Sequence, residues 1–413
     1  MNKTLLWLLF SMTLNLTANA EEKKNDIWTL ENSLKRLFEE NEIIKAFSGS
    51  TESIKALITS GRMPNPEIEI GATNEFSVQK GKRGYDYNTI SISQKFPLAE
   101  LFYGKDVRKA NYKKSLSDKD DLILKLNLEF SLIFRELQYK KGLLDLANNE
   151  LILLKKQISD KKQKVVRFQS PLDKTKMELI INEGFINMKK IEEEIHELEA
   201  KIKTFLNISE KNEFNVSSIQ KLKNIGHQIS KSPSHPAVNS LVAEKYSIEK
   251  QITKEKTNRF GEVELTAFNQ QEFIFNKPTS TNGALIKFSI PLWSWRGSKI
   301  NSLKHKKTEI SYRLNSIKRI YKSEQQIIFK HYKHQLNLQG FILSTQIPKA
   351  KIFLDKTIKS YAVGQTNILS LIDAYQGYFG AKKTLLELLH GGWREYEELR
   401  YLTNNFQKIG GTK

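Results

Sequence analysis

The sequence contains no cysteine, and this absence excludes several kinds of chemistry. Without thiols the chain can form no disulfide and can supply neither a thiol nucleophile nor Cys-based metal ligands. The lipid anchor of bacterial lipoproteins is excluded as well, because no cysteine follows the cleavage site described below. Long apolar runs are missing beyond the N-terminus, and the mean hydropathy is −0.48. A bundle of transmembrane helices, each about 20 apolar residues long, is therefore not expected.

Signatures of an enzyme are scarce too. There is no Gly-rich phosphate loop with the residues of a P-loop, and no nucleophile elbow. His331 and His334 lie three residues apart on an expected helix and could share a metal, but among so many lysines we interpret them as a solvent-facing pair. We therefore expect no enzymatic activity, no cofactor and no metal site. No partner at ligand spacing accompanies His196, His227, His235 or His305.

The N-terminus has the features of an export signal. Lys3 supplies a positive charge, Leu5–Phe10 begin an apolar core, and Ala18-Asn19-Ala20 forms a small-residue cleavage site. This combination predicts a secretory signal peptide over residues 1–20, not an anchor. The mature chain is then exported without lipidation.

The chain is strongly basic, with 66 Lys and Arg against 46 Asp and Glu and a formal net charge of +20. The lysines, such as Lys155-Lys156 and Lys189-Lys190, are spread along helical patterns and alternate with glutamates such as Glu192–Glu194. We interpret them as the solvated faces of long helices. Nucleic-acid binding is not expected, because no groove-reading motif accompanies the charge.

A strand followed by proline and a long helix occurs twice. In Tyr87–Leu98 apolar and polar residues alternate, as in a strand with one apolar face. Pro97 cannot donate to a sheet ladder, so the strand is expected to end there and a helix to follow. The same strand-to-helix join recurs about 194 residues later around Pro291. This recurrence predicts a tandem repeat.

The first repeat is assigned to residues 21–206. It comprises a helical stretch over 26–61, a β-hairpin over 67–98 and a helical hairpin over 101–206. A polar linker is expected at 207–233.

The second repeat covers residues 234–405. It comprises a helix to about residue 258, a β-hairpin over 262–293 with its polar turn at 276–283, and a helical hairpin over 297–405. Residues 406–413 form a polar tail.

The helical hairpins have apolar residues spaced alternately by three and four. In the first hairpin this seam runs from Ile123 to Leu154, broken only by Lys140, and resumes from Ile181 to Phe205. Such heptad spacing predicts helices packed side by side as in a coiled coil. An arm of some 60 residues would reach roughly 90 Å, which no compact domain needs.

The four expected strands could cross a membrane when tilted, but they are too few to close a barrel. A membrane barrel needs about eight strands, and open sheet edges cannot sit in lipid. Several chains must therefore donate strands to one shared barrel, with the helical hairpins forming a second tube across the periplasm. Trp293 and Trp295 after the fourth strand are interpreted either as part of a membrane-interface girdle or as a cap on a local core.

Together these motifs resemble the TolC-like outer-membrane efflux family over nearly all of the mature chain. Three motifs look most like the CzcC-type branch of this family: the Asn-Pro start, the Ser-Gln strand and the Ile-Pro-Leu strand. That branch works with resistance-nodulation-division pumps that export heavy metals. The resemblance rests on Asn65–Ile70, Ser93–Leu98, Ile290–Trp293 with Arg296-Gly297, and Tyr361–Gly364 leading to Asp373-Ala374.

The resemblance implies a mostly α fold with a small β part, assembled as a homotrimer with a 12-stranded β-barrel and a 12-helix α-barrel. It implies a passive outer-membrane exit duct for an efflux system, in contact with outer-membrane lipid, a periplasmic adaptor and an inner-membrane pump. The adaptor would dock at the helix turns, at Ser170, Pro171, Tyr361 and Gly364. The second turn keeps the Tyr-x-x-Gly pattern, whereas Arg167 and Ser170 stand for Tyr and Gly in the first.

Two other classes remain open. A periplasmic adaptor or coiled-coil scaffold would explain the heptads and the export, but not two β-hairpins with apolar faces. A secreted basic nucleic-acid binder would show binding that weakens steeply with salt. The cargo of the duct, whether metal, drug or protein, is not encoded in these motifs.

Overall fold

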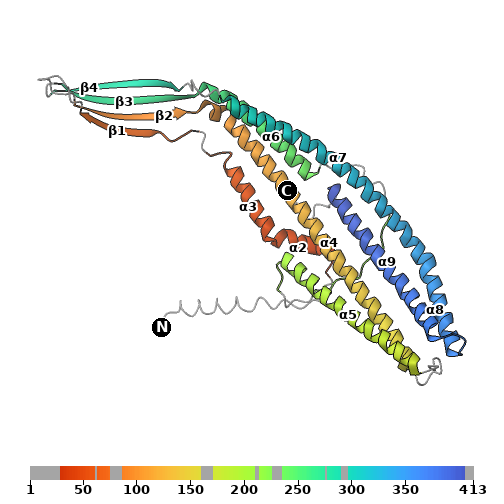
Figure 1. Cartoon of the computed structure of the whole chain (residues 1–413). Coiled ribbons are helices and arrows are strands. Elements are labelled where there is room, and N and C mark those ends of the chain that lie inside the picture. The colour runs from red at the N-terminus through yellow and green to blue at the C-terminus, as the bar shows by residue number, and fades with distance from the viewer. Residues whose placement is uncertain are drawn as a thin grey trace, which may run out of the picture. The chain divides into compact units, whose positions relative to one another are not determined.

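The computed structural model describes residues 28–60, 63–74, 86–159, 171–209, 214–225, 235–274, 277–289 and 296–404 (Figure 1). The expected signal peptide and the tail at 406–413 lie outside these residues. The described chain divides into two compact units: unit 1 comprises residues up to 39, 133–221 and 341–390, and unit 2 comprises 40–132, 222–340 and the chain from 391 onward. None of the described helices is both long and apolar enough to cross a membrane.

Unit 1 is built on long helices whose apolar seams share one core. Its helices are α2 (Leu30–Glu40), the second part of α4 (Lys105–Ser159), α5 (Pro171–Phe205), α8 (Ile347–Ala362) and most of α9 (Ile368–Leu402). One buried cluster contains Leu154 of α4, Met177 of α5, Leu354 of α8, and Leu371 and Phe379 of α9. Burying each such side chain contributes about 1.5–3 kcal/mol, so this core is a main source of stability.

The seam between α4 and α5 uses the positions that the heptad spacing selects. Leu137, Leu151 and Met188 are buried, and Gly184 lies so close to Leu151 that an added Cβ would meet its Cδ2 at 2.9 Å. Lys140, the one polar residue in the sequence seam, is only 21% exposed and its Nζ lies 2.6 Å from Glu194 of α5. A partly buried lysine is tolerated here because a carboxylate on the facing helix compensates its charge.

The helical stretch expected over 26–61 is two helices, so the prediction of one element is wrong. Helix α2 ends at Glu40, and α3 (Glu42–Ala56) starts after Asn41, whose backbone is extended. The Asn41 side chain accepts hydrogen bonds from the backbone N–H groups of Ile43 and Ile44, at 3.0 and 3.3 Å. Asparagine satisfies the free donors of a helix start in this way, and here it starts a new helix.

The segment expected to be a polar linker is partly packed. In unit 1, Trp28 N donates to Asn215 O at 2.8 Å and its ring stacks on Phe214 with centroids 5.1 Å apart. Phe214 and Ile219 are buried. In this stretch a few apolar residues among polar ones suffice to anchor an extended chain.

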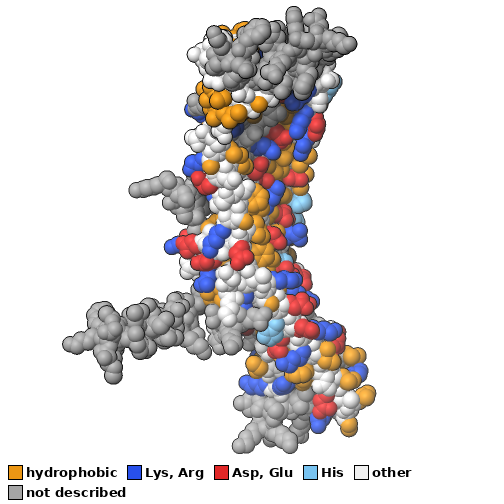
Figure 2. Space-filling view, turned by 90° about the vertical axis from the view of Figure 1, so that its left-hand side faces the viewer, with side chains coloured by type: hydrophobic (Ala, Val, Ile, Leu, Met, Phe, Trp, Pro, Cys, Tyr) orange, Lys and Arg blue, Asp and Glu red, His pale blue; other side chains and the backbone are white. Residues whose placement is uncertain are grey.

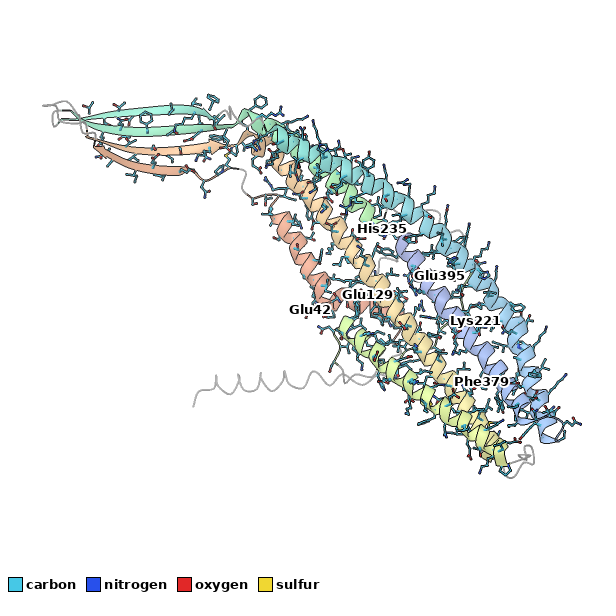
Figure 3. All side chains as sticks on the ribbon, in the orientation of Figure 1. Glu42, Glu129, Lys221, His235, Phe379 and Glu395 are labelled. Atoms are coloured by element: carbon cyan, nitrogen blue, oxygen red, sulfur yellow. The ribbon has the colours of Figure 1, made fainter. Side chains whose placement is uncertain are left out.

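Unit 2 contains α3, the first part of α4, α6 (Pro236–Thr257), α7 (Gly297–Phe341), the end of α9 and a sheet. His235 caps α6 by accepting the Ala237 N–H at Nδ1, and its ring lies against those of Tyr321 and Tyr401 (Figure 3). Burial lowers the pKa of His235, while Asp121 opposes this shift. A neutral imidazole is what an acceptor at a helix start requires.

The sheet consists of β1 (Glu67–Asn74), β2 (Asp86–Phe96), β3 (Glu262–Ile274) and β4 (Lys277–Ser289), all antiparallel in the order β1-β2-β3-β4. The two hairpins therefore join into one sheet through β2 and β3, whose paired residues run from Asp86–Phe273 to Phe96–Val263.

The polar turn expected at 276–283 is wrong, because β4 already begins at Lys277. Gly283 pairs with Phe268 inside the sheet. The ring of Phe268 covers the glycine, and an added Cβ would meet its Cζ at 2.4 Å. Gly283 thus makes room for a cross-strand aromatic ring, whereas the sequence suggested that it breaks the strand.

Unit 2 also holds a carboxyl group with an unusual proton affinity. Burial raises the pKa of Glu395 to about 7, the neighbouring Glu398 adds to the rise, and Gln335 and Arg394 oppose it. Its side chain, labelled in Figure 3, is 18% exposed. Its Oε1 atom lies 3.7 Å from His331 Nδ1. Near neutral pH this group holds its proton much more strongly than an exposed glutamate does.

Replacing Leu371 by alanine should destabilise unit 1 strongly. Leu371 is fully buried in the helical core, and a leucine truncated in such a site costs about 2–5 kcal/mol. Thermal unfolding followed by the helical circular dichroism signal should show a clearly lower midpoint. The exposed Gln376→Ala on the same helix should leave it within a degree or two, since such surface changes stay within about 0.5 kcal/mol. Equal midpoints for the two variants would contradict this packing.

The free energy of unfolding should fall as the pH rises from about 4.5 to about 7, because of Glu395. Between the unfolded value of 4.5 and the folded value of about 7, the folded chain keeps a proton that the unfolded chain releases. Glu395→Gln should remove this loss and raise stability at pH 8 by on the order of 2–3 kcal/mol. Denaturant titrations at pH 5 and pH 8 measure it, with the exposed Glu387→Gln as control. If the free energy of unfolding of Glu395→Gln depended on pH as that of the wild type does, the raised pKa of Glu395 would be refuted.

Candidate functional site

One face of the sheet is almost entirely apolar and exposed. The register places alternate residues of all four strands on this face. The most exposed large side chains are Ile70, Ile68 and Phe288, at 78%, 70% and 70% of their surface. The apolar members of the face are Ile68, Ile70, Ala72, Ile90, Ile92, Phe96, Val263, Leu265, Ala267, Ala284, Ile286 and Phe288. A surface of this kind is stable only in contact with something apolar.

Amide side chains take over from the apolar ones towards the turn end of the sheet. Asn269 donates to Asn282 Oδ1 at 2.6 Å and to Ser280 Oγ at 3.0 Å across β3 and β4. Asn88 of β2 and Gln271 of β3 lie on the same face further out. The apolar surface is therefore a band with a polar border.

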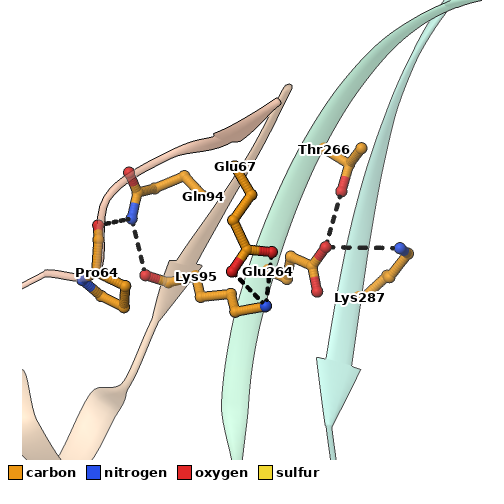
Figure 4. Close-up of polar contacts among 7 residues, drawn as sticks. All are labelled: Pro64, Glu67, Gln94, Lys95, Glu264, Thr266 and Lys287. Carbon is orange, nitrogen blue, oxygen red and sulfur yellow. Dashed lines mark hydrogen bonds and ion pairs between the residues drawn. The ribbon is translucent and has the colours of Figure 1, made fainter. Parts of the chain in front are cut away.

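The opposite face of the sheet is mostly polar, with Phe268 and Leu285 as large apolar residues, and it carries ion pairs (Figure 4). Lys95 of β2 lies 2.8 Å from Glu67 of β1. Glu264 of β3 accepts from Thr266 at 3.3 Å and lies 3.6 Å from Lys287 of β4. Such pairs add little stability where their side chains are exposed, and they mark this face as the polar one.

The edges of the sheet are open within the described chain. Strands β1 and β4 each pair with one neighbour only. An open edge presents a row of unpaired N–H and C=O groups, which can pair with a further strand.

The first strand-to-helix join lies at Pro97. Strand β2 ends at Phe96, and the Pro97 carbonyl accepts the N–H groups of Glu100 and Leu101, both at 3.0 Å. A π-helical turn, Glu100–Gly104, leads from there into α4. The corresponding residues of the second join, Pro291 with Trp293 and Trp295, lie outside the described residues.

Two residues at the end of α6, Lys254 and Glu255, form ion pairs with residues that follow the two strand-to-helix joins. Lys254 and Arg108 donate to Glu100 after the first join, and the neighbouring Glu255 pairs with residues after the second. Burial alone would raise the pKa of Glu100, but hydrogen bonds from the two cations hold it below its usual value. Two adjacent residues of one helix thus bind the starts of two long helices.

The Glu255 carboxylate lies 2.8 Å from Arg296 and 2.7 Å from Lys299. Although burial opposes it, hydrogen bonds from these two cations lower the pKa of Glu255. Sequence reasoning missed Glu100, Lys254 and Glu255. The only available signal was their position within a few residues of a strand end.

The turn between α8 and α9 is a compact cap. Gly364 has a φ of 77°, its N–H donates to Tyr361 O at 3.1 Å, and Gln365 N donates to Ser360 O at 2.9 Å. This is the Schellman arrangement, in which glycine supplies the left-handed residue after a helix. Asn367 then starts α9 by accepting the Ser370 N–H at 2.9 Å. The Tyr-x-x-Gly pattern therefore has a structural cause at its glycine.

Tyr361 links this turn to the start of α5. Its side chain is 1% exposed, and its hydroxyl lies 3.2 Å from Asp173 Oδ2. Pro171 is the first residue of α5 and is exposed, whereas Ser170 lies outside the described residues. Of the predicted tip residues, Tyr361 and Gly364 lie together in one turn. This turn is hydrogen-bonded through Tyr361 to Asp173 of α5, the helix that begins at Pro171.

No cluster of three or more His, Asp or Glu side chains within the described ranges is arranged to hold a metal ion. His331 and His334 are both exposed on α7. No pair of titratable side chains in these ranges suggests a reaction. The main features are a sheet with one apolar and one polar face, and an α8–α9 turn that is hydrogen-bonded to α5.

The comparisons with known proteins agree with this geometry. No protein-family model matches the chain, and no curated protein sequence matches it. Solved structures do match. The structure of CusC, described in terms of transmembrane channel formation, has a TM-score of 0.72 at 12% identity and covers 93% of this chain and 95% of its own.

Two outer-membrane channels from named organisms are equally similar. The open MtrE channel of Neisseria gonorrhoeae gives a TM-score of 0.72 at 13% identity, covering 91% of this chain and 88% of its own. The CmeC channel of Campylobacter jejuni gives 0.73 at 12% identity, covering 93% and 90%. The expected fold class, mostly helical with a small antiparallel sheet, is confirmed. Over nearly its whole length, the chain has the fold of outer-membrane channels.

Proposed function

We propose that the chain is one subunit of a homotrimeric outer-membrane channel, the passive exit duct of a tripartite efflux system. The observation that carries the proposal is the sheet, which has one exposed apolar face, one polar face and two open edges. The likeness in fold to outer-membrane channels supports it.

Lipid is the environment that suits the apolar face. Strands β2, β3 and β4 have 11, 13 and 13 residues, which at about 3.4 Å per residue is enough to cross an apolar layer roughly 25 Å thick. The polar face would then line water. This division follows the rule that lipid-facing and lumen-facing residues alternate along barrel strands.

Closure of the barrel needs further copies of the chain. In a sheet of four strands the outer edges of β1 and β4 stay unpaired, and open edges are not tolerated in lipid. Pairing of β4 of one copy with β1 of the next removes both edges, and three copies give the 12 strands that the family resemblance implies. The trimer is thus the assembly that satisfies the backbone of the sheet.

The helices of unit 1 offer a second contact between copies. On α5, Leu172, Leu179 and Ile186 follow one another at seven-residue intervals and are 65%, 62% and 56% exposed. On α8, Ile352 and Phe353 are 55% and 54% exposed. Apolar residues at heptad spacing on the outside of a helix fit a neighbouring helix, as in a coiled coil.

The helix tips are the proposed docking sites of a periplasmic adaptor. The Tyr361–Gly364 turn is held firmly by its cap and by Asp173, and it exposes 69% of Val363. Pro171 and Ser170 belong to the other tip. A rigid turn with an exposed apolar side chain is a suitable contact for a partner helix, and an inner-membrane resistance-nodulation-division pump would complete the system.

Several finer points belong to the proposal as well. The chain is exported through a signal peptide over 1–20 and not lipidated, it is built as a tandem repeat of residues 21–206 and 234–405, and Trp293 and Trp295 lie at the membrane interface. Heavy-metal cations are the proposed cargo, on the motifs shared with the CzcC-type branch. An adaptor or scaffold role is not favoured, since it has no use for a two-faced sheet.

An arginine on the apolar face of the sheet should abolish membrane assembly, whereas the same residue on the polar face should not. Ile90→Arg puts a charge towards lipid, which costs about 2–4 kcal/mol per copy near the membrane centre. Thr89→Arg, one residue earlier, points to the opposite face. Trimers in the outer-membrane fraction, counted on gels without heating, should be lost only in the first variant. Loss in both or in neither would contradict the assignment of the faces.

Deleting the chain in a host that expresses its adaptor and pump should increase sensitivity to the exported compounds. Inhibitory concentrations of divalent metal ions and of organic drugs distinguish the two cargo classes. A lower inhibitory concentration for metal ions only supports heavy-metal cations as the cargo, and a lower inhibitory concentration for drugs only rejects it. Purified protein should also conduct ions in planar bilayers, and the absence of both effects would reject the channel.

A further inference from the structure

Positive charge is concentrated on α7. This helix of 45 residues carries ten Lys and Arg but only two Glu. Helix α5, with 35 residues, carries six Lys against eight Asp and Glu. On the face that Figure 2 shows, basic and acidic side chains are interspersed. The cations of α7 thus lie on a solvated face, as the sequence predicts, but they are not interspersed with glutamates as those of α5 are.

Six cations of α7 lie on one side of the helix, which we call the basic stripe. They are separated by neutral polar residues at spacings of three and four, including Thr308, Asn315 and Gln326, so that the whole row faces one way. All six side chains belong to exposed residues. The stripe consists of Lys304, Lys318, Arg319, Lys322, Lys330 and Lys333.

The basic stripe is not neutralised by the chain itself. No acidic side chain of the described residues lies within ion-pair distance of its six cations, and Glu309 and Glu324 project from other sides of the helix. By contrast, Lys307, outside the stripe, lies 2.9 Å from Glu249 of α6. An uncompensated row of like charges raises the local positive potential and so attracts anionic partners.

The stripe is exposed in the single chain, and the side of α7 that packs in unit 2 is a different one. That side carries Ile310, Leu314 and Tyr332, all buried. Tyr312, which is 72% exposed, lies within the stripe, seven residues before Arg319, whereas Ile320, which is 48% exposed, projects from another side of the helix.

The length of the stripe decides what kind of anion it fits. Residues 304 to 333 extend about 44 Å along the helix at 1.5 Å per residue. Charges beyond a Debye length of about 8 Å are screened, so a flat membrane surface at one end would reach only the nearest lysine. An extended polyanion lying along the helix can contact all six.

We propose that the basic stripe of α7 binds peptidoglycan through the carboxylates of its peptide stems. The inference rests on the proposed function, in which α7 begins at Gly297 next to the membrane-spanning strands and runs into the periplasm. The extended anionic polymer in that compartment is the cell wall. Binding anchors the channel laterally in the wall and needs no apolar contact.

The test is co-sedimentation of the detergent-solubilised full chain with purified peptidoglycan sacculi. The wild-type protein should bind at low salt and be released as the salt concentration rises. Lys318→Gln with Lys322→Gln should weaken binding by roughly fivefold per lysine, the value for a lysine at an anionic surface. The matched control, Lys306→Gln with Arg313→Gln, removes the same charge from another side of α7 and should bind as the wild type does.

Each other outcome overturns the inference. These outcomes are equal binding by the two double variants, no binding by the wild type, binding that is insensitive to salt, and equally tight stripe-dependent binding to phosphatidylglycerol vesicles. A changed oligomeric state in the stripe variant alone would place the stripe between copies and reject it as well. Conductance in planar bilayers, measured on the same samples, separates this failure from failure of the channel, since a conducting protein that ignores sacculi disproves only the stripe.

Discussion

The sheet imposes the main constraint on this molecule, because its exposed apolar face cannot be left in water. Ile68, Ile70, Ile90 and Ile92 lie together on one face, and each square ångström of their apolar surface left in water costs about 25 cal/mol of free energy. The open edges at β1 and β4 add unpaired backbone groups to the same problem. The proposed arrangement, with lipid on one face, water on the other and copies at both edges, would satisfy all of these demands at once.

The long helices solve a different problem, that of stabilising helices of up to 55 residues without a globular core. Unit 1 uses one seam of buried residues between α4 and α5 and a shared core with α8 and α9. Where a polar residue interrupts a seam, a partner compensates it, as Glu194 does for Lys140. The tip needs no extended core, since a glycine cap and the Tyr361–Asp173 contact hold it.

Much of this architecture is legible in the sequence because it depends on periodicity. The alternation in Tyr87–Leu98 and the heptads from Ile123 to Leu154 are repeated over many residues, so single exceptions such as Lys140 do not hide them. Local polar chemistry is less legible. Asn41 divides one expected helix into two, because a side chain that competes for backbone donors leaves no periodic signal.

Contacts between distant segments are the least predictable part. Gly283 looks like a turn residue until the ring of Phe268 is seen to cover it. The Glu255–Arg296 ion pair joins residues 41 positions apart and the Glu100–Lys254 ion pair joins residues 154 positions apart, and no spacing rule marks either of them. The charge on α7 shows the same limit: its number of lysines is evident from the sequence, but the sequence does not show that no carboxylate of the described residues lies within ion-pair distance of the basic stripe.

The adjacency of Lys254 and Glu255 has a mechanical consequence. One residue is bonded to the helix that follows β2, and the next is bonded to the helix that follows β4. Since neighbouring residues of a helix cannot move independently, a tilt of one strand pair against its helix is passed on to the other. The two hairpins would therefore lean in step, and in the proposed trimer a tilt would have to be shared by both hairpins of each subunit.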